Sequence, residues 1–308
     1  NQLLKLGTTR VELGIQTLND HTLKITNRGH TLNDSIKATQ LLKDSFLKTC
    51  YHMMQGLPES TKQEDINNFK EIFSNQDYKP DALKIYPCMV MPGTPLYEQY
   101  KKGLFKPINT EEAAEIIIEG KKFIPKYCRV MRIQRDIPTK VTIDGVNITN
   151  LRQYIHELMK KRGIKCNCIR CREPMNKEID FDSIKLNRLD YEASNGQEIF
   201  LSFDDMKNDI LLGFIRLRIP YKPFRKEITN KSAGIREIHV YGQATSLGEK
   251  GRVQHKGYGK LLLEEAEKIA KEEFDINKML IIAGIGVKRY FIDKFNYKKD
   301  GPYMSKPL

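Results

Sequence analysis

Two short stretches of the sequence combine residue types and spacings that could do chemistry. The first reads Gln254-His255-Lys256-Gly257-Tyr258-Gly259. Because glycine has no Cβ, backbone N–H groups near Gly257 and Gly259 can approach a pyrophosphate, and a helix that begins there adds the positive end of its dipole. The stretch therefore predicts a phosphate-binding turn, while a plain connection between secondary-structure elements stays open on these residues alone.

The second stretch, Cys166-x-Cys168-x-x-Cys171, lies in a segment crowded with lysine and arginine. Three thiolates at this spacing can hold a tetrahedral Zn²⁺ when a fourth ligand comes from elsewhere. The candidates for that ligand are His52, Cys88, Cys128 and a residue upstream. The alternative is three reduced thiols in a surface loop, but the spacing favours zinc. The six cysteines form no regular disulfide framework, which favours a reducing, cytoplasmic setting.

The phosphate-binding turn needs a strand before it and a helix after it. Residues 235–241 alternate apolar and polar side chains with β-branched content, which predicts a strand. After the turn, Leu262, Ala266 and Ile269 recur at helical spacing, so one face of the predicted helix packs while the charged residues between them face water. The apolar run 279–283 predicts the next strand, which completes the order strand, turn, helix, strand.

The first half of the chain shows strand-like runs separated by segments long enough for helices. The runs cover residues 10–16, 46–53, 83–90 and 129–134. This repeating pattern predicts parallel strands with helical crossovers, in either a doubly wound sheet or a barrel. In both arrangements the ligand site lies at the carboxyl ends of the strands, where this sequence has polar or Gly- and Pro-rich segments.

Length and composition restrict the class of protein. A chain of 308 residues is long enough for about two domains, and we expect a bidomain protein. With 40% hydrophobic and 30% charged residues and no apolar run near the ~18 residues that a membrane helix needs, the sequence predicts a soluble protein without a membrane partner. The excess of 52 lysine and arginine residues over 39 acidic ones gives +13, which favours a polyanionic partner: RNA, DNA or the phosphates of coenzyme A.

A series of longer motifs follows in order along the chain. In the first half these are Arg10–Gln16, Asn27–Thr31, His52–Pro58 and Lys84–Pro87. They resemble the radical S-adenosylmethionine domain of the Elongator catalytic subunit family. In the second half, residues 236–242, 254–259, 264–267 and 301–304 resemble the acetyltransferase domain of the same family, at similar spacing. The resemblance covers nearly the whole chain, and we identify the sequence as an archaeal-type member.

The resemblance implies an α/β fold: part of a radical S-adenosylmethionine (βα) barrel, then a zinc-type linker, then a GNAT-like α+β acetyltransferase domain. The corresponding boundaries are 1–138 for the C-terminal part of the barrel domain, 139–185 for the basic cysteine-containing linker and 186–308 for the acetyltransferase domain. It also implies a tRNA uridine(34) acetyltransferase. Such an enzyme uses acetyl-CoA and S-adenosylmethionine to form a carboxymethyl-type group on C5 of the wobble uridine.

The family holds a [4Fe–4S] cluster with three cysteines of one short loop, and that motif is absent from this sequence. We expect it upstream of Asn1, so that the chain as given should not carry out the radical step. The implied partners are tRNA and, unless the protein acts alone, other Elongator-type subunits. The alternative function is a protein lysine acetyltransferase with the barrel as a docking module. A third interpretation is a non-catalytic tRNA-binding fragment.

The resemblance also implies roles for residues of the first half. Gln16 and Arg28 match positions that bind S-adenosylmethionine. Lys84 and Tyr86 stand at alternate positions of a strand end, hence on one face, and match positions that would contact the uridine or its phosphate as catalytic residues. Without the match, they would be interpreted as ordinary surface and core residues.

In the second half, strand amides would pair with the pantetheine arm of acetyl-CoA and the glycine turn would contact the pyrophosphate. Tyr290 would lie near the sulfur as a ligand contact or catalytic proton donor, or else simply pack on the sheet. The family usually has two tyrosines there, and this chain has Tyr290-Phe291. Glu237 is either a base or a structural partner. The implied acetyl-CoA-binding residues are Glu237, Ile238, His239, Val240, Gln254, Gly257, Tyr258, Gly259, Lys260, Tyr290 and Phe291.

Overall fold

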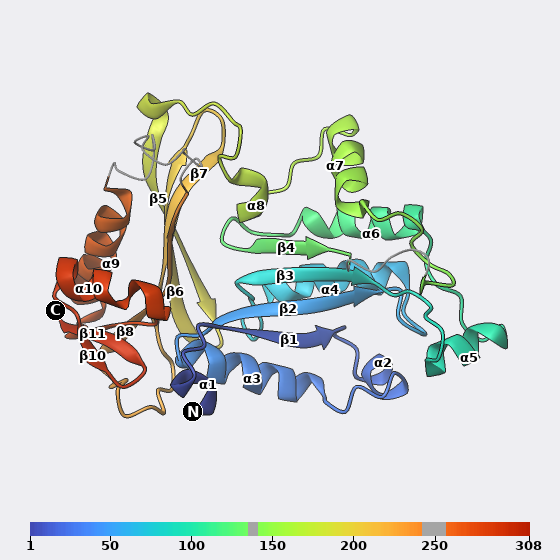
Figure 1. Cartoon of the computed structure of the whole chain (residues 1–308), viewed down its shortest axis with the longest axis horizontal. Helices are drawn as coiled ribbons and strands as arrows, with labels where there is room; N and C mark the ends of the chain where they lie inside the picture. Colours follow the sequence, from blue (N-terminus) through green and yellow to red (C-terminus); the bar gives the residue numbers. More distant parts are fainter. Residues whose placement is uncertain (135–140, 242–256) are drawn as a thin grey trace. The chain divides into compact units, whose positions relative to one another are not determined.

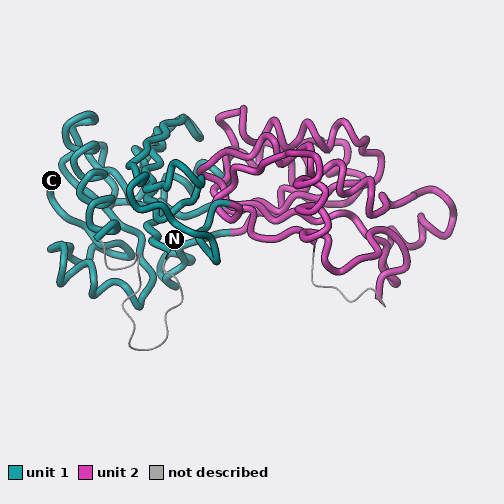
Figure 2. The backbone as a smooth tube through the Cα atoms, turned by 90° about the horizontal axis from the view of Figure 1, so that it is seen from above, with its two compact units in different colours: residues 1–11, 38–49, 172–308 teal, residues 12–37, 50–171 magenta. Residues whose placement is uncertain are grey.

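The structure is a computed structural model that describes residues 1–134, 141–241 and 257–308. The chain divides into two compact units, neither of which is one continuous segment (Figure 2). Unit 1 comprises residues 1–11, 38–49 and 172–308, and unit 2 comprises residues 12–37 and 50–171. The segment 38–49, from the first half of the sequence, therefore folds with the second half. The domain boundaries expected after residues 138 and 185 stay predictions.

A four-stranded sheet, most of whose residues belong to unit 2, has the strand order β1-β2-β3-β4 (Figure 1). Its strands are β1 (Arg10–Gln16), β2 (Lys48–Gln55), β3 (Ala82–Pro87) and β4 (Arg129–Ile133). The pairings β2–β3 and β3–β4 are parallel, as helical crossovers require. The helices are α2 (Asp20–Ile25), α3 (Leu32–Asp44), α4 (Lys62–Ser74), α5 (Pro95–Lys101) and α6 (Thr110–Lys121). The predicted alternation of strands and helices is confirmed.

Local sequence explains how helices α4 and α6 begin and pack. Thr61 and Asn109 each start a capping box, in which the cap side chain accepts a backbone N–H and a glutamate three residues later reaches back. Helices α4 and α6 approach closely because Gly120 has no side chain: a Cβ there would lie 2.4 Å from the ring of Phe69.

The turn after β2 is fixed by a buried carboxyl group. Gly56 has a φ of +70°, which glycine adopts without strain. Its backbone N–H donates to Oδ2 of Asp65 at 2.7 Å, and Asp65 is only 2% exposed. Burial raises the pKa of Asp65 to about 7, although the hydrogen bond from Gly56 acts to lower it.

Two further helices carry the basic, cysteine-containing part of the chain. They are α7 (Leu151–Lys161) and α8 (Ile169–Arg172). Leu151, Ile155 and Met159 bury one face of α7, and its last turn carries Lys160 and Lys161. Among the described residues, no helix is both long and apolar enough to cross a bilayer.

The sheet of unit 1 has seven strands in the order β10-β11-β9-β8-β7-β6-β5. Its strands are β5 (Ile184–Ala193), β6 (Gly196–Asp205), β7 (Ile210–Ile219), β8 (Ser232–Val240), β9 (Lys278–Ile281), β10 (Lys298–Asp300) and β11 (Tyr303–Pro307). The helical segments are α1 (Gln2–Lys5), η2 (Phe181–Ser183), α9 (Tyr258–Phe274), η3 (Ile285–Val287) and α10 (Lys288–Phe295). Leu262, Ala266 and Ile269 of α9 are buried in the core of this unit, as their spacing predicts.

Strand β8 pairs with β9 over only part of its own length. The parallel register runs from Ser232 opposite Lys278 to Ile235 opposite Ile281, and a last backbone bond joins the N–H of Ile282 to the carbonyl of Ile235 at 3.2 Å. Beyond Ile235, β8 continues to Val240 paired with β7. Within residues 1–134, 141–241 and 257–308, no strand pairs with β8 on that side beyond Ile235, which leaves an open edge over the last residues of β8.

The end of α3 and the start of β2 are built into unit 1. Phe46 and Leu47 belong to a buried cluster with Leu280 and Tyr303. A Cβ on Gly234 would lie 2.3 Å from the ring of Phe46, so β8 and this segment meet without an intervening side chain. A buried network of charged groups extends the contact: Arg218 with Asp44 and Glu198, and Arg236 with Glu198 and the carbonyl of Leu47.

Candidate functional site

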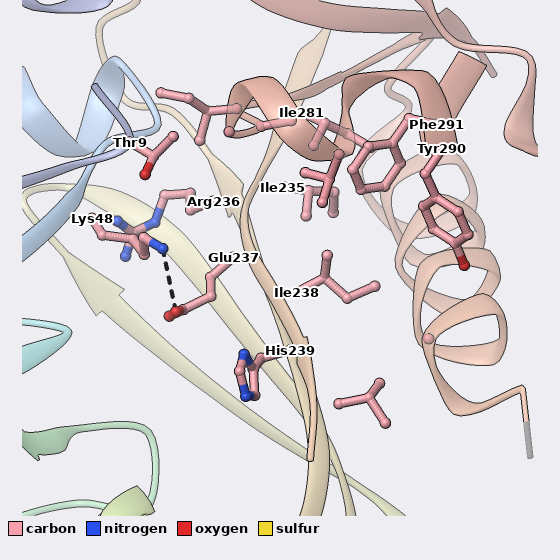
Figure 3. A pocket seen from close by; sticks show the side chains of 16 residues that line it. Thr9, Lys48, Ile235, Arg236, Glu237, Ile238, His239, Ile281, Tyr290 and Phe291 are labelled. Atoms are coloured by element: carbon pink, nitrogen blue, oxygen red, sulfur yellow. Dashed lines mark hydrogen bonds and ion pairs between the residues drawn. The ribbon is translucent and has the colours of Figure 1, made fainter. Parts of the chain in front are cut away.

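Unit 1 contains a cavity of about 350 Å³ at the open edge of β8 (Figure 3). Its lining residues come from β8, the segment after β9, α10, the start of α9 and the amino ends of β1 and β2: Thr9, Lys48, Ile235–Val240, Gly259, Ile281–Gly284, Val287, Tyr290 and Phe291. At one end, a Cβ on Gly259 would lie 3.6 Å from the side chain of Val240. At the other end the cavity is lined by Ile235 and Ile281, where β8 and β9 join.

Residues Glu237–Val240, predicted from the sequence to bind acetyl-CoA, line this cavity. The carboxylate of Glu237 accepts a hydrogen bond from Nε of Arg216 at 2.9 Å and another from Nζ of Lys48 at 3.3 Å. This ion pairing favours the structural interpretation of Glu237 over the role of a base. Lys48 was not anticipated, since its sequence separation from Glu237 is 189 residues and no local pattern links them.

The amino end of α9 lies at the cavity. Gly257 precedes the helix with a φ of 76°, in the left-handed region that glycine tolerates, and has no side-chain cap. The ring of Tyr258 packs against the ring of Phe203, with 4.7 Å between the ring centroids. Lys260 is exposed, and its Nζ lies 3.6 Å from Oε1 of Glu264. Gln254 lies outside the described residues. The helix has 17 residues, long enough for its dipole to attract an anion at this end.

Tyr290 and Phe291 belong to α10 and line another wall of the cavity. Phe291 is 3% exposed and belongs to the hydrophobic core, whereas Tyr290 is 50% exposed. The two rings meet edge to face at 5.6 Å. The first of the two aromatic residues is thus available to a ligand, and the second supports it.

Unit 2 holds a polar cluster at Lys84 and Tyr86. Oε2 of Glu12 is bonded to Nε2 of His52 at 2.7 Å and to Nζ of Lys84 in a short contact. The rings of His52 and Tyr86 meet edge to face at 5.4 Å. Partial burial acts to raise the pKa of Glu12, but the bonds from Lys84 and His52 outweigh it and lower that pKa. Glu12 was not anticipated as the link between these side chains.

Gln16 and Arg28 meet around Gly14, so the structure brings together these two predicted residues. A Cβ on Gly14 would lie 2.9 Å from Nη2 of Arg28 and 3.0 Å from Nε2 of Gln16. The space that a side chain would fill is therefore left to the two polar groups. Gln16 has a φ of 70°, a strained backbone that persists only where the surroundings enforce it.

The sulfur atoms of Cys166, Cys168 and Cys171 lie within 4.8 Å of one another and could hold a metal ion. Hydrogen bonds from the other two thiols hold the pKa of Cys168 well below its usual range. Nε2 of His156, on α7, lies 3.9 Å from Sγ of Cys171. Burial, aided by Lys121, lowers the pKa of His156 to about 4, so its ring is neutral as a metal ligand must be. His156 was not among the ligands expected from the sequence.

Comparison with known proteins gives these sites a context. The Radical SAM superfamily model matches residues 1–70, and the Radical_SAM C-terminal domain model matches residues 80–161. The chain is 55% identical over 317 residues to the tRNA uridine(34) acetyltransferase of Methanocaldococcus jannaschii, covering 100% of the chain and 58% of that relative. It is 41% identical over 317 residues to Elongator complex protein 3 of Saccharomyces cerevisiae, covering 100% of the chain and 57% of that relative. The chain thus spans little more than half the length of these relatives.

A solved structure of the archaeal Methanocaldococcus infernus Elp3 with an N-terminal deletion matches with a TM-score of 0.95 and 53% identity. The match covers 100% of this chain and 74% of that one. It confirms the predicted α/β fold class with its radical S-adenosylmethionine part. The chain therefore belongs to the family of Elongator complex protein 3 and the tRNA uridine(34) acetyltransferases.

Proposed function

We propose that this chain is the part of a tRNA-modifying enzyme that binds acetyl-CoA and presents it for modification of the wobble uridine. The observation that carries the proposal is the open edge of β8 beside the amino end of α9 in one cavity. An acyl-CoA fits both features, because its pantetheine amides can pair with a strand edge and its phosphates favour a helix amino end. The reaction class is that of the relatives named tRNA uridine(34) acetyltransferase.

In this proposal the backbone of Glu237, Ile238, His239 and Val240 pairs with the pantetheine arm. Gly257, Tyr258, Gly259 and Lys260 contact the pyrophosphate, together with Gln254. Tyr290 lies beside the sulfur, where its exposed hydroxyl can reach a ligand, and Phe291 fixes its ring. The net charge of +13 supports tRNA as the second substrate, through contacts to its phosphates.

In unit 2 we assign the polar groups around Gly14 to S-adenosylmethionine. That cofactor, bound at a [4Fe–4S] cluster, supplies the radical chemistry by which a carboxymethyl-type group is attached to C5 of uridine 34. Gln16 and Arg28 would bind its polar atoms in the space that a side chain on Gly14 would fill. Lys84 and Tyr86 would contact the uridine, and Glu12 would hold the ammonium group of Lys84 in place.

We assign Zn²⁺ to Cys166, Cys168, Cys171 and His156. Ligand atoms of a tetrahedral zinc site lie about 3.5–3.8 Å apart, because each bond is about 2.0–2.3 Å long. The 3.9 Å between His156 and Cys171 and the grouping of the three sulfur atoms support this geometry. The proposed organisation is then a barrel part at 1–138, a zinc-binding linker at 139–185 and an acetyltransferase domain at 186–308.

The test uses the intact protein with its cluster reconstituted. It is incubated with tRNA, acetyl-CoA and S-adenosylmethionine, and the mass of uridine 34 is measured after nuclease digestion. We expect the mass increase of a carboxymethyl-type group that depends on both cofactors. An unchanged uridine 34 together with acetylated lysines on added protein would refute the proposal in favour of a lysine acetyltransferase.

A further inference from the structure

The end of the cavity in unit 1 where β8 joins β9 carries a cation, Lys48. It is the first residue of β2, and its backbone N–H donates to the carbonyl of Thr9 at 3.1 Å. Both residues line the cavity. Figure 3 shows the side chain of Lys48 beside Glu237, on the side of the cavity away from Tyr290. The amino ends of two strands thus complete a cavity that is otherwise built from residues 235–291.

The ammonium group of Lys48 is held in place from one side only. It donates to Oε1 of Glu237 at 3.3 Å, while Oε2 of Glu237 is bonded to the buried Arg216. A lysine has three N–H donors, and no second protein acceptor for Lys48 is found in the part of the chain that the structure describes. Its side chain is 21% exposed, so a donor is available to a ligand in a largely enclosed place.

The other cation that lines the cavity is committed to the protein. Arg236 is 1% exposed. Its Nε donates to Glu198 at 3.1 Å, and its Nη1 donates to the carbonyl of Leu47 at 2.9 Å. Lys48 is therefore the lining cation that is oriented for a ligand.

The direction of an acyl-CoA in the cavity places its thioester at this end. The pyrophosphate site is at Gly257–Gly259, next to Val240, and the thioester is at the opposite end of the pantetheine arm. From Val240, β8 leads through Glu237 to Ile235, where β8 pairs with β9. The carbonyl oxygen of the acyl group would lie beside Lys48. This oxygen is a hydrogen-bond acceptor, and the ligand itself has no cation next to it.

We propose that Lys48 binds the carbonyl oxygen of the acyl group and so makes the cavity prefer acetyl-CoA over free coenzyme A. Glu237 is the positioning residue that holds Lys48. A charge-assisted hydrogen bond in a partly enclosed site is strong enough to give such a preference. This inference rests on the proposed function, because it deepens the acetyl-CoA site and names what the site distinguishes.

The experiment compares the affinities of the intact protein for acetyl-CoA and for coenzyme A by calorimetric titration at pH 7, where the free thiol is mostly neutral. The variant is Lys48→Met, which keeps the length of the side chain and removes its charge. Lys231→Met is the matched control, because Lys231 also pairs with a carboxylate, Asp275, but lies outside the cavity. Lys48→Gln serves as a second variant if the first one does not fold.

We expect Lys48→Met to lower the affinity for acetyl-CoA at least tenfold and to leave the affinity for coenzyme A within twofold of wild type. The control variant should change neither affinity. Unchanged coenzyme A binding also reports that the cavity is intact. An equal loss for both ligands, or no loss for either, would overturn the role of Lys48. Wild-type protein that binds neither ligand would refute the proposed acetyl-CoA site itself, which separates that failure from one of Lys48 alone.

Discussion

The buried carboxyl group of Asp65 should make the stability of the protein depend on pH. Burial raises its pKa to about 7 from the ordinary value of 3.8, so the folded state keeps a proton that the unfolded state releases. The stability that the group confers is therefore fully present below pH 3.8 and is lost as pH rises through about 7. With these two values, linkage gives a loss of about 3 kcal/mol in the free energy of unfolding between pH 5 and pH 8.

The variant Asp65→Asn removes the titration and keeps an oxygen that can accept the hydrogen bond from Gly56. Urea unfolding of wild type and variant at pH 5, 6, 7 and 8 measures the difference. We expect the stability of the variant relative to wild type to rise by about 3 kcal/mol over this range. Glu111→Gln, at an exposed position of α6, is the control and should follow wild type. Parallel pH profiles for Asp65→Asn and wild type would show that the carboxyl group does not titrate in this range.

Other substitutions test the metal centre and the core of unit 1. His156→Ala should reduce bound zinc below one ion per chain in metal analysis of the purified protein, and a full complement would exclude His156 as a ligand. Gly234→Ala should cost about 1–3 kcal/mol in urea unfolding, because its Cβ would meet the ring of Phe46 at 2.3 Å, and wild-type stability would contradict the close packing. Arg218→Met should cost about 3–5 kcal/mol because it leaves Asp44 buried without its cation. A loss below about 1 kcal/mol, read from thermal melting and urea unfolding, would mean that this network is not needed for stability.

The elements of the fold could be predicted from the sequence better than their ends. Strand β1 has the expected bounds, whereas the run expected at 46–53 is a strand only from Lys48 to Gln55. Phe46 is apolar because it lies in the core of unit 1, and its φ of 61° excludes it from a strand. Likewise the run 83–90 is interrupted after Pro87, and Val90 forms an isolated bridge with Asp144. Apolar character reports burial, and burial is not confined to strands.

The residues of the candidate sites also differ in how well they could be predicted from the sequence. Residues that act through a local pattern, such as Gly259 at the start of α9 or the cysteines of one loop, could be predicted from spacing. Lys48 and Glu12 could not, because each gains its role from a partner 189 or 72 positions away. His156 had a weaker signal: it lies 15 residues before Cys171, but no spacing rule selects it.

The placement of residues 38–49 in unit 1 has a consequence for how the chain is made and how it can change. Phe46 and Leu47 leave the ribosome long before Leu280 and Tyr303, with which they are buried. At about 5–20 residues per second, these apolar side chains wait roughly 10–50 s for their partners. A single cut in the gene cannot separate the two units. Any cut between residues 12 and 171 divides both units, and a cut after residue 171 removes residues 1–11 and 38–49 from unit 1. The two units therefore cannot be exchanged as separate continuous segments of the chain.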